Sequence, residues 1–165
     1  MSENITETIF IESYDRFADE IFRFCFFKVS DRELAVDLAQ EVFIKFFEYI
    51  QKGNFVTNPR ALLYRIADHS IIDWYRKKRS VSLDALTEDG FEPPDHGPRT
   101  DLHAEVQEAL ATLSKLAPDD RDIITWRYVN ELSPKEIAAM IDQSENVVSV
   151  RIHRALKRLQ EFLHK

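Results

Sequence analysis

The sequence is poor in cysteine and glycine, and both shortages narrow the classes of function. The single cysteine, Cys25, excludes an intramolecular disulfide framework, and its phenylalanine neighbours predict a buried, inert thiol. None of the three glycines lies in a phosphate-binding GxxxxGK[ST] loop, which argues against a P-loop nucleotide site. The five histidines form neither HExxH nor a zinc-ligand spacing. We therefore expect no catalytic residue, no metal and no cofactor. A metal-dependent nuclease built from helix-borne carboxylates is the enzymatic alternative.

Long hydrophobic runs are also missing. Apolar stretches such as residues 21–27 are short and interrupted by Arg23, far below the length that crosses a membrane. The first ten residues lack the basic segment and apolar core that mark a secretory signal. These features predict a cytoplasmic protein without membrane insertion.

An excess of positive charge is lacking as well, since the formal net charge is −7. Residues 86–104 hold five acids and one base, whereas residues 1–85 hold fourteen acids and twelve bases. Residues 105–165 hold ten acids and nine bases. Because salt screens charges beyond about 10 Å, local cation clusters decide whether a phosphate backbone is attracted. The total charge therefore does not exclude DNA binding.

The pattern along the chain is helical on both sides of one irregular segment. Residues 84–101 contain two of the three glycines and three of the six prolines, with little apolar periodicity. No alternating strand pattern or hairpin signal stands out elsewhere. We predict an all-α protein of two small helical domains, residues 1–83 and 102–165, joined by an acidic flexible linker over residues 84–101.

Residues 132–159 predict two helices joined by a tight turn. Ser133, Pro134 and Glu136 form a capping box with proline at the first helical position, and Ser144 can cap the second helix. The outward positions of the second helix are Asn146, Ser149, Val150, His153, Arg154 and Lys157, with Arg151 and Arg158 beside them. Such a helix can enter a DNA major groove while its cations neutralise phosphates. The alternative is an amphipathic helix pair with a solvated basic face.

The first domain predicts three helices. The first covers residues 9–28, and the second begins at Ser30, where residues 30–33 form a capping box. The third covers residues 60–78, with Asn58 as its cap. Arg65, His69, Ile72, Arg76 and Arg79 share one face of it. The run of four cations at residues 76–79 either caps the end of this helix or, with Tyr64, Tyr75 and Arg65, binds nucleic acid.

Two further helices precede the helix pair in the second domain. One covers residues 101–113, and the other starts at Pro118 and continues through Val129. Trp126 and Tyr128 lie on the second of these helices, and we expect both rings to pack.

At this point the chain resembles the group-four, or extracytoplasmic-function, sigma factors of bacterial RNA polymerase. Residues 37–47 (DLAQEVFIKFF) resemble the polymerase-binding helix of that family, and residues 58–80 resemble its minus-ten promoter segment. Residues 132–159 resemble its minus-thirty-five helix-turn-helix. The three motifs occur in the order of the family and span nearly the whole chain.

The resemblance assigns roles to the candidate residues. It implies that Asp37, Gln40, Glu41 and Lys45 bind core polymerase, where the polar side of their helix otherwise reads as merely solvated. It implies minus-ten DNA contacts for Asn54, Phe55, Arg60, Tyr64, Arg65, His69 and Arg76, although Phe55 can equally be a core residue. It implies minus-thirty-five contacts for Ser144, Asn146, Ser149, Val150, Arg151, His153, Arg154 and Lys157. Asp142 stands where the turn of the family often has glycine, and aspartate tolerates a left-handed backbone better than most residues.

The function implied is that of a non-catalytic initiation factor, which directs promoter recognition and DNA melting. Its expected partners are the β′ clamp and β flap of core RNA polymerase, promoter DNA and, in some members, an anti-sigma factor. We expect a monomer when free and an association with the nucleoid within holoenzyme. The alternative is a stand-alone helix-turn-helix regulator whose first domain senses a signal or dimerises.

Overall fold

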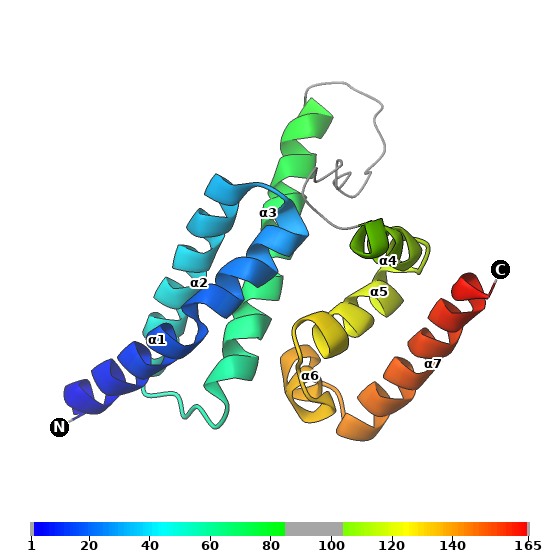
Figure 1. Ribbon diagram of the computed structural model, residues 1–165. Coiled ribbons are helices and arrows are strands. Elements are labelled where there is room, and N and C mark those ends of the chain that lie inside the picture. Colours follow the sequence, from blue (N-terminus) through cyan, green and yellow to red (C-terminus); the bar gives the residue numbers. More distant parts are fainter. Residues whose placement is uncertain (1, 85–103, 165) are drawn as a thin grey trace. The chain divides into compact units, whose positions relative to one another are not determined.

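The computed structural model describes residues 2–84 and 104–164, and every regular element in these two ranges is a helix (Figure 1). The chain divides into two compact units, residues 1–96 and 97–165. The predicted linker lies outside the described residues, apart from Asp84, which ends the third helix. The expected all-α class with two domains is confirmed, whereas the residue limits of the domains stay a prediction.

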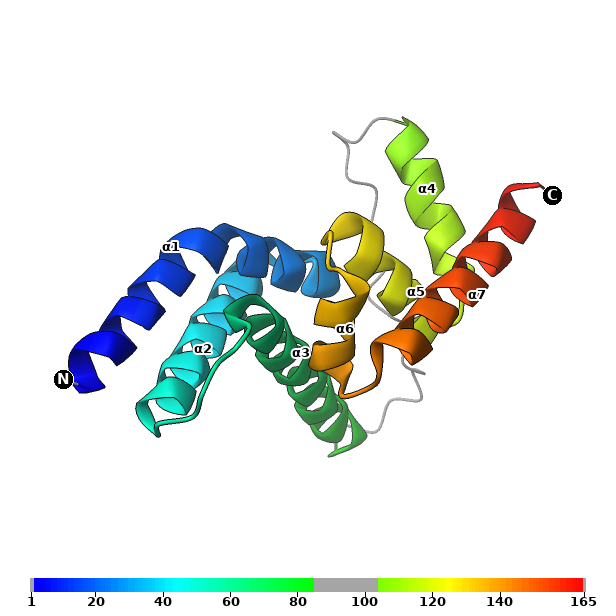
Figure 2. The ribbon, with the colours of Figure 1, turned by 90° about the horizontal axis from the view of Figure 1, so that it is seen from below.

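The first unit is a bundle of three helices, which lie side by side in both views (Figures 1 and 2). They are α1 (Ser2–Val29), α2 (Arg32–Gln51) and α3 (Pro59–Asp84). Its core is rich in aromatic and branched side chains, which come from all three helices. The core includes Phe17, Ile21, Phe24, Leu38, Val42, Phe43, Phe46, Leu63, Ala67 and Ile71. Cys25 is fully buried as expected, and burial raises the pKa of its thiol to about 12.

The junction between α1 and α2 differs from the prediction. Ser30 adopts a left-handed backbone conformation, with φ at 55°, and its N–H closes α1 by donating to the carbonyl of Phe26. Asp31 takes the extended conformation of an N-cap, and its side chain accepts from the N–H of Leu34 at 3.0 Å. The predicted cap at Ser30 is therefore wrong, because that residue already terminates the preceding helix.

The second unit contains α4 (Ala104–Ser114), α5 (Pro118–Ile124), the π-helical turn η1 (Thr125–Val129), α6 (Pro134–Ile141) and α7 (Glu145–Leu163). Helix α7 packs against α4, α5 and α6. The predicted helix from Pro118 through Val129 is present, but its last turn widens, since the N–H of Asn130 donates to the carbonyl of Thr125. Trp126 is buried as expected, whereas Tyr128 is exposed, so the prediction that both rings pack is wrong for Tyr128.

Candidate nucleic-acid interface

The loop between α2 and α3 lies at one end of the first unit and is anchored on both sides (Figure 1). At its α2 end, Gly53 takes a φ of 80°, and the side-chain amide of Asn54 donates to the carbonyl of Tyr49 at 2.9 Å. At its α3 end, the side chain of Asn58 accepts from the N–H of Ala61 at 3.0 Å, which confirms the predicted cap. Only three residues separate Asn54 from Asn58.

Phe55 lies between these anchors with 86% of its surface exposed. The sequence left open whether this ring belongs to the core or to the surface, and the structure places it on the surface. A phenyl ring held open to solvent by an anchored loop has a face on which an unpaired base can stack. Asn54, by contrast, uses its amide to hold the loop itself.

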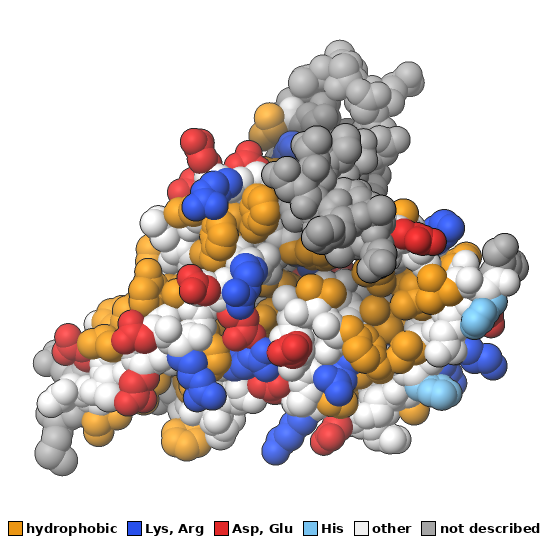
Figure 3. Space-filling view, viewed as in Figure 1, with side chains coloured by type: hydrophobic (Ala, Val, Ile, Leu, Met, Phe, Trp, Pro, Cys, Tyr) orange, Lys and Arg blue, Asp and Glu red, His pale blue; other side chains and the backbone are white. Residues whose placement is uncertain are grey.

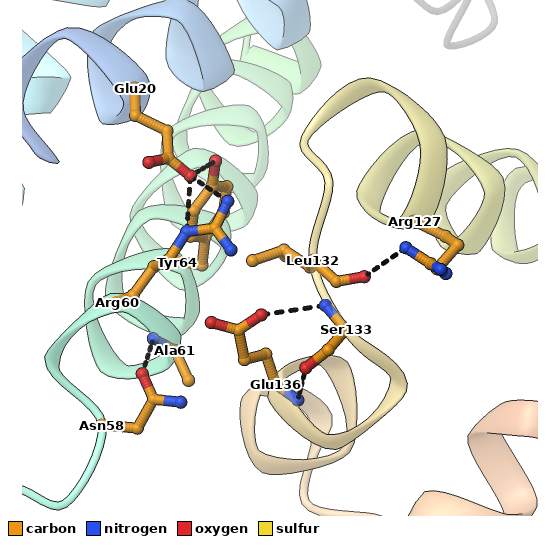
Figure 4. Close-up of polar contacts among 9 residues, drawn as sticks. All are labelled: Glu20, Asn58, Arg60, Ala61, Tyr64, Arg127, Leu132, Ser133 and Glu136. Carbon is orange, nitrogen blue, oxygen red and sulfur yellow. Dashed lines mark hydrogen bonds and ion pairs between the residues drawn. The ribbon is translucent and has the colours of Figure 1, made fainter.

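The beginning of α3 is fastened to α1 by a single carboxylate. Arg60 donates from Nε to Oε1 of Glu20 at 2.7 Å, and the hydroxyl of Tyr64 donates to the same oxygen at 2.8 Å (Figure 4). The ring of Tyr64 packs edge-on against Phe24, and Tyr64 is completely buried. Burial, followed by the hydrogen bond to Glu20, raises the pKa of Tyr64 above its ordinary range.

Two predicted minus-ten residues therefore have other duties in the first unit. Tyr64 offers no surface for a base, so its predicted DNA contact is wrong: helix packing has placed its ring in the core. Arg60 is largely buried and its guanidinium is paired with Glu20 at 2.5 Å from Nη2. Glu20 was not foreseen, because nothing in the sequence indicates which of the acids of α1 faces α3.

The remaining predicted cations of α3 lie on its surface. Arg65, His69 and Arg76 are exposed, as are Ile72 and Arg79, which share their face. The helix continues to Asp84, beyond the run of cations at residues 76–79. The prediction that these cations end the helix is wrong, and a charge-capping role at the last turn cannot explain them.

The polar side of α2 presents three of its four predicted polymerase-binding residues. Asp37, Gln40 and Glu41 are exposed. Lys45 is half-buried, pairing with Glu41 at 2.6 Å and donating to the buried hydroxyl of Ser70 on α3 at 3.0 Å. Ile44 is also exposed on this stripe, and the sequence analysis did not predict it. Its spacing from Gln40 and Glu41 indicates that it lies off the apolar face of the helix.

Helices α6 and α7 form the predicted helix-turn-helix. The Ser133 hydroxyl accepts from the N–H of Glu136, whose carboxylate accepts from the N–H of Ser133, so the capping box is confirmed (Figure 4). Asp142 ends α6 in the left-handed region, with φ at 54° and ψ at 49°. Ser144 then caps α7 by accepting from the N–H of Val147. Asp142 thus adopts the left-handed conformation that glycine usually supplies at the end of a helix.

The outward face of α7 carries the predicted minus-thirty-five residues. The exposed members are Ser144, Asn146, Ser149, Val150, His153, Arg154 and Lys157. In Figure 3, cationic and histidine side chains gather over this helix. Arg151 is partly buried, and its guanidinium donates to the side chain of Gln143 in the turn at 3.2 Å. The opposite face buries Val148, Ile152 and Ala155 in the core of the unit.

Arg158 is set apart from the other cations of α7. It pairs with Asp120 on α5, which ties the C-terminal part of α7 to the body of the unit. In the described ranges there is no group of three or more histidine, cysteine, aspartate or glutamate side chains that can hold a metal ion. No helix within residues 2–84 or 104–164 has the length and apolarity that a membrane span requires.

Two family models match the chain, one in each of its two helical units. Residues 13–81 match Sigma-70 region 2, and residues 106–159 match Sigma-70 region 4. The chain is 28% identical over 157 residues to the ECF RNA polymerase sigma factor SigX of Bacillus subtilis, covering 91% of this chain and 81% of the relative. It is 29% identical over 168 residues to SigW of the same species, covering 93% of this chain and 88% of the relative.

A solved structure has the same fold. It is the sigma factor RpoE of Bartonella quintana in complex with the anti-sigma factor NepR, with a TM-score of 0.68 at 23% identity. The match covers 94% of this chain and 96% of that chain. With both sigma regions matched in order, the chain belongs to the sigma-70 family as an extracytoplasmic-function sigma factor, a non-catalytic subunit that directs RNA polymerase in transcription initiation.

Proposed function

We propose that the two units bind separate surfaces of bacterial core RNA polymerase and read the two elements of a promoter. The first unit binds the β′ clamp and the minus-ten element, where it promotes melting. The second unit binds the β flap and the minus-thirty-five element. The observation that carries this proposal is the exposed Phe55 ring on an anchored loop, beside a cationic helix.

At the minus-ten element, Phe55 stacks on a base that has left the duplex, and Asn54 keeps the loop in shape. Removing a base from its stack costs about a few kcal/mol, which stacking on an aromatic ring offsets by about 1–3 kcal/mol. Arg65, His69 and Arg76 lie on the exposed side of α3, where they guide the phosphates of the separating strands.

At the minus-thirty-five element, α7 enters the major groove with its amino-terminal half. Asn146, Ser149 and Val150 lie nearest to the base edges, and Arg151, His153, Arg154 and Lys157 serve the bases and phosphates along the groove. Ser144 accepts from Val147 through its oxygen, which leaves its hydroxyl proton for a phosphate oxygen.

The surface for core polymerase is the exposed stripe of Asp37, Gln40 and Glu41 on α2, extended by the apolar side chain of Ile44. Lys45 acts at its edge, where its ion pair orients the Glu41 carboxylate. A stripe of acids around an exposed aliphatic group suits a partner surface that is basic with an apolar centre.

Neither unit needs to bind DNA tightly alone. Polymerase holds both at promoter spacing, so the second DNA contact is effectively intramolecular. The free factor is then a cytoplasmic monomer that binds promoters weakly and joins the nucleoid within holoenzyme. The sigma factor RpoE of Bartonella quintana was solved in complex with an anti-sigma factor, and we propose that this chain also binds an anti-sigma protein.

The test is transcription in vitro with core polymerase, this protein and a pool of promoter fragments. Start sites that require the added protein are expected, and aligning them reveals both recognition sequences. Reversing the charges of Asp37 and Glu41 is expected to abolish retention of core polymerase. Tight operator binding by the free protein, indifferent to polymerase, would instead favour a stand-alone regulator.

A further inference from the structure

Glu20 on α1 receives three contacts on one carboxylate oxygen, all from the first two turns of α3. Nε and Nη2 of Arg60 lie 2.7 and 2.5 Å from Oε1, and the Tyr64 hydroxyl lies 2.8 Å from it. Arg60 and Tyr64 are one helical turn apart, so their side chains leave the same face and converge on this atom (Figure 4). The side chains of Glu20 and Arg60 are each 21% exposed, so water screens the pair only partly.

Arg60, which makes two of these contacts, follows the Phe55 loop directly in the chain. Asn58 caps α3 one residue before its first helical position, and Arg60 is the second residue of that helix. The other end of the loop is anchored to α2 through Asn54. With only residues 55–57 between the two anchors, the position of Phe55 depends on where the beginning of α3 is held.

We propose that Glu20 is a positioning residue for minus-ten recognition, which acts through Arg60 and Tyr64 to hold the Phe55 loop where an unpaired base is received. The carboxylate touches no DNA. It keeps the first turns of α3 against α1, so that the loop pays no ordering cost when the base arrives. This inference rests on the proposed capture of a minus-ten base by Phe55.

The geometry also gives Arg60 an indirect role. A guanidinium that contacts a phosphate has to leave Glu20, and removal of the carboxylate charge would then make promoter binding tighter. A guanidinium that holds the helix has the opposite behaviour, because removal of the charge loosens the loop. The sign of the effect of Glu20→Gln therefore separates the two roles of Arg60.

The experiment uses holoenzyme assembled from core polymerase and the full chain. Its probes are fork-junction DNAs with the natural base or an abasic site at each minus-ten position in turn. The measured quantity is the ratio of affinities for the natural and abasic probes, which isolates base capture from attachment to polymerase. Glu20→Gln is expected to lower the largest ratio about tenfold, with an unchanged salt dependence of binding. Glu12→Gln is the matched control, because Glu12 is an exposed acid two turns earlier on α1.

Tyr64→Phe serves as a second variant should Glu20→Gln fail to fold, since it removes one donor and keeps the buried ring. It is expected to lower the ratio by a smaller factor. An unchanged ratio in either folded variant, or tighter binding by Glu20→Gln with a steeper salt dependence, overturns the inference and leaves the proposed function standing. A wild-type ratio near one at every position overturns base capture itself, and the inference with it.

Discussion

Helices α3 and α7 carry the candidate DNA-binding residues of their units, but these residues are distributed differently between the buried and exposed faces of the two helices. In α7, the buried side chains Val148, Ile152 and Ala155 lie opposite an exposed face that holds all the predicted residues except the partly buried Arg151. In α3, predicted DNA-binding residues are found on both sides: Arg65 is exposed, while Tyr64 is in the core and Arg60 is paired with Glu20.

The difference follows from how much of each helix is buried. In α7, the residues Val148, Ile152 and Ala155 form one narrow buried stripe, and the opposite side stays exposed. In α3, a larger part of the circumference is used for the bundle, and its buried residues include Ala61, Leu63, Tyr64, Ala67 and Ile71. Substitutions in α7 are therefore expected to separate DNA binding from stability, whereas those early in α3 affect both.

The largest effect is expected from charge reversal of Arg151 and Arg154. Arg151→Glu with Arg154→Glu replaces attraction to the DNA backbone by repulsion, which is expected to reduce minus-thirty-five-dependent initiation about 100-fold or more. Retention of core polymerase should not change. The measurement is promoter-specific transcription beside a pull-down of core enzyme. Lys115→Glu, a charge reversal in the loop between α4 and α5, controls for added negative charge. An equal loss of promoter-specific transcription in both proteins would contradict the assignment of α7 as the helix that reads the minus-thirty-five element.

A smaller effect is expected from Phe55→Ala in the first unit. Loss of stacking should reduce melting of the minus-ten element about tenfold or more. The free energy of unfolding should change by less than about 0.5 kcal/mol, because the ring is already exposed. Permanganate reactivity of unpaired thymines measures melting, and urea unfolding measures stability. Val81→Ala, which truncates an exposed apolar side chain on α3, is the control. A large loss of stability with Phe55→Ala would show that the ring packs.

A moderate effect on stability alone is expected from the capping box of α6. Ser133→Ala removes the acceptor for the N–H of Glu136 and should destabilise the second unit by about 1 kcal/mol. The two tryptophans make this measurable, because Trp74 belongs to the first unit and Trp126 to the second. In a Trp74→Phe background, urea unfolding followed by fluorescence reports on Trp126. Ser149→Ala on the exposed side of α7 should have no such effect, and an unchanged unfolding midpoint of Ser133→Ala would contradict the stabilising role of this cap.

The smallest effect on stability at neutral pH is expected from the ionisation of the Cys25 thiol. Its pKa rises from an ordinary 9.0 to about 12 on burial, so the folded protein holds the thiol proton more tightly than the unfolded chain. This contribution to stability is complete below pH 9 and is lost as the pH rises from 9 towards 12. Urea unfolding at stepped pH should show an alkaline decline in the first unit that is shallower in Cys25→Ala. Rapid modification of native Cys25 by a thiol reagent at pH 8 would contradict its burial.

Several parts of the candidate sites could be predicted because they depend on residues close in the chain. The caps at Asn58, Ser133 and Ser144 each join a side chain to a backbone group three residues away, so the sequence shows both partners. The predicted cap at Ser30 was wrong because Ser30 terminates α1, and Asp31 takes the N-cap position of α2. The exposed face of α7 followed from helical periodicity alone.

Spacing along one helix is enough to define a face, so the helical class, the position of the helix-turn-helix and the polar stripe of α2 followed from the order of the residues. The contacts between helices did not follow from it. Glu20 holds Arg60 and Tyr64, which lie 40 and 44 residues further along the chain, and Lys45 reaches Ser70. The exposure of Phe55 to solvent likewise emerged only from the packed fold. Such pairs form only when one helix packs on another at a particular rotation, and many acids and rings satisfy the same local pattern.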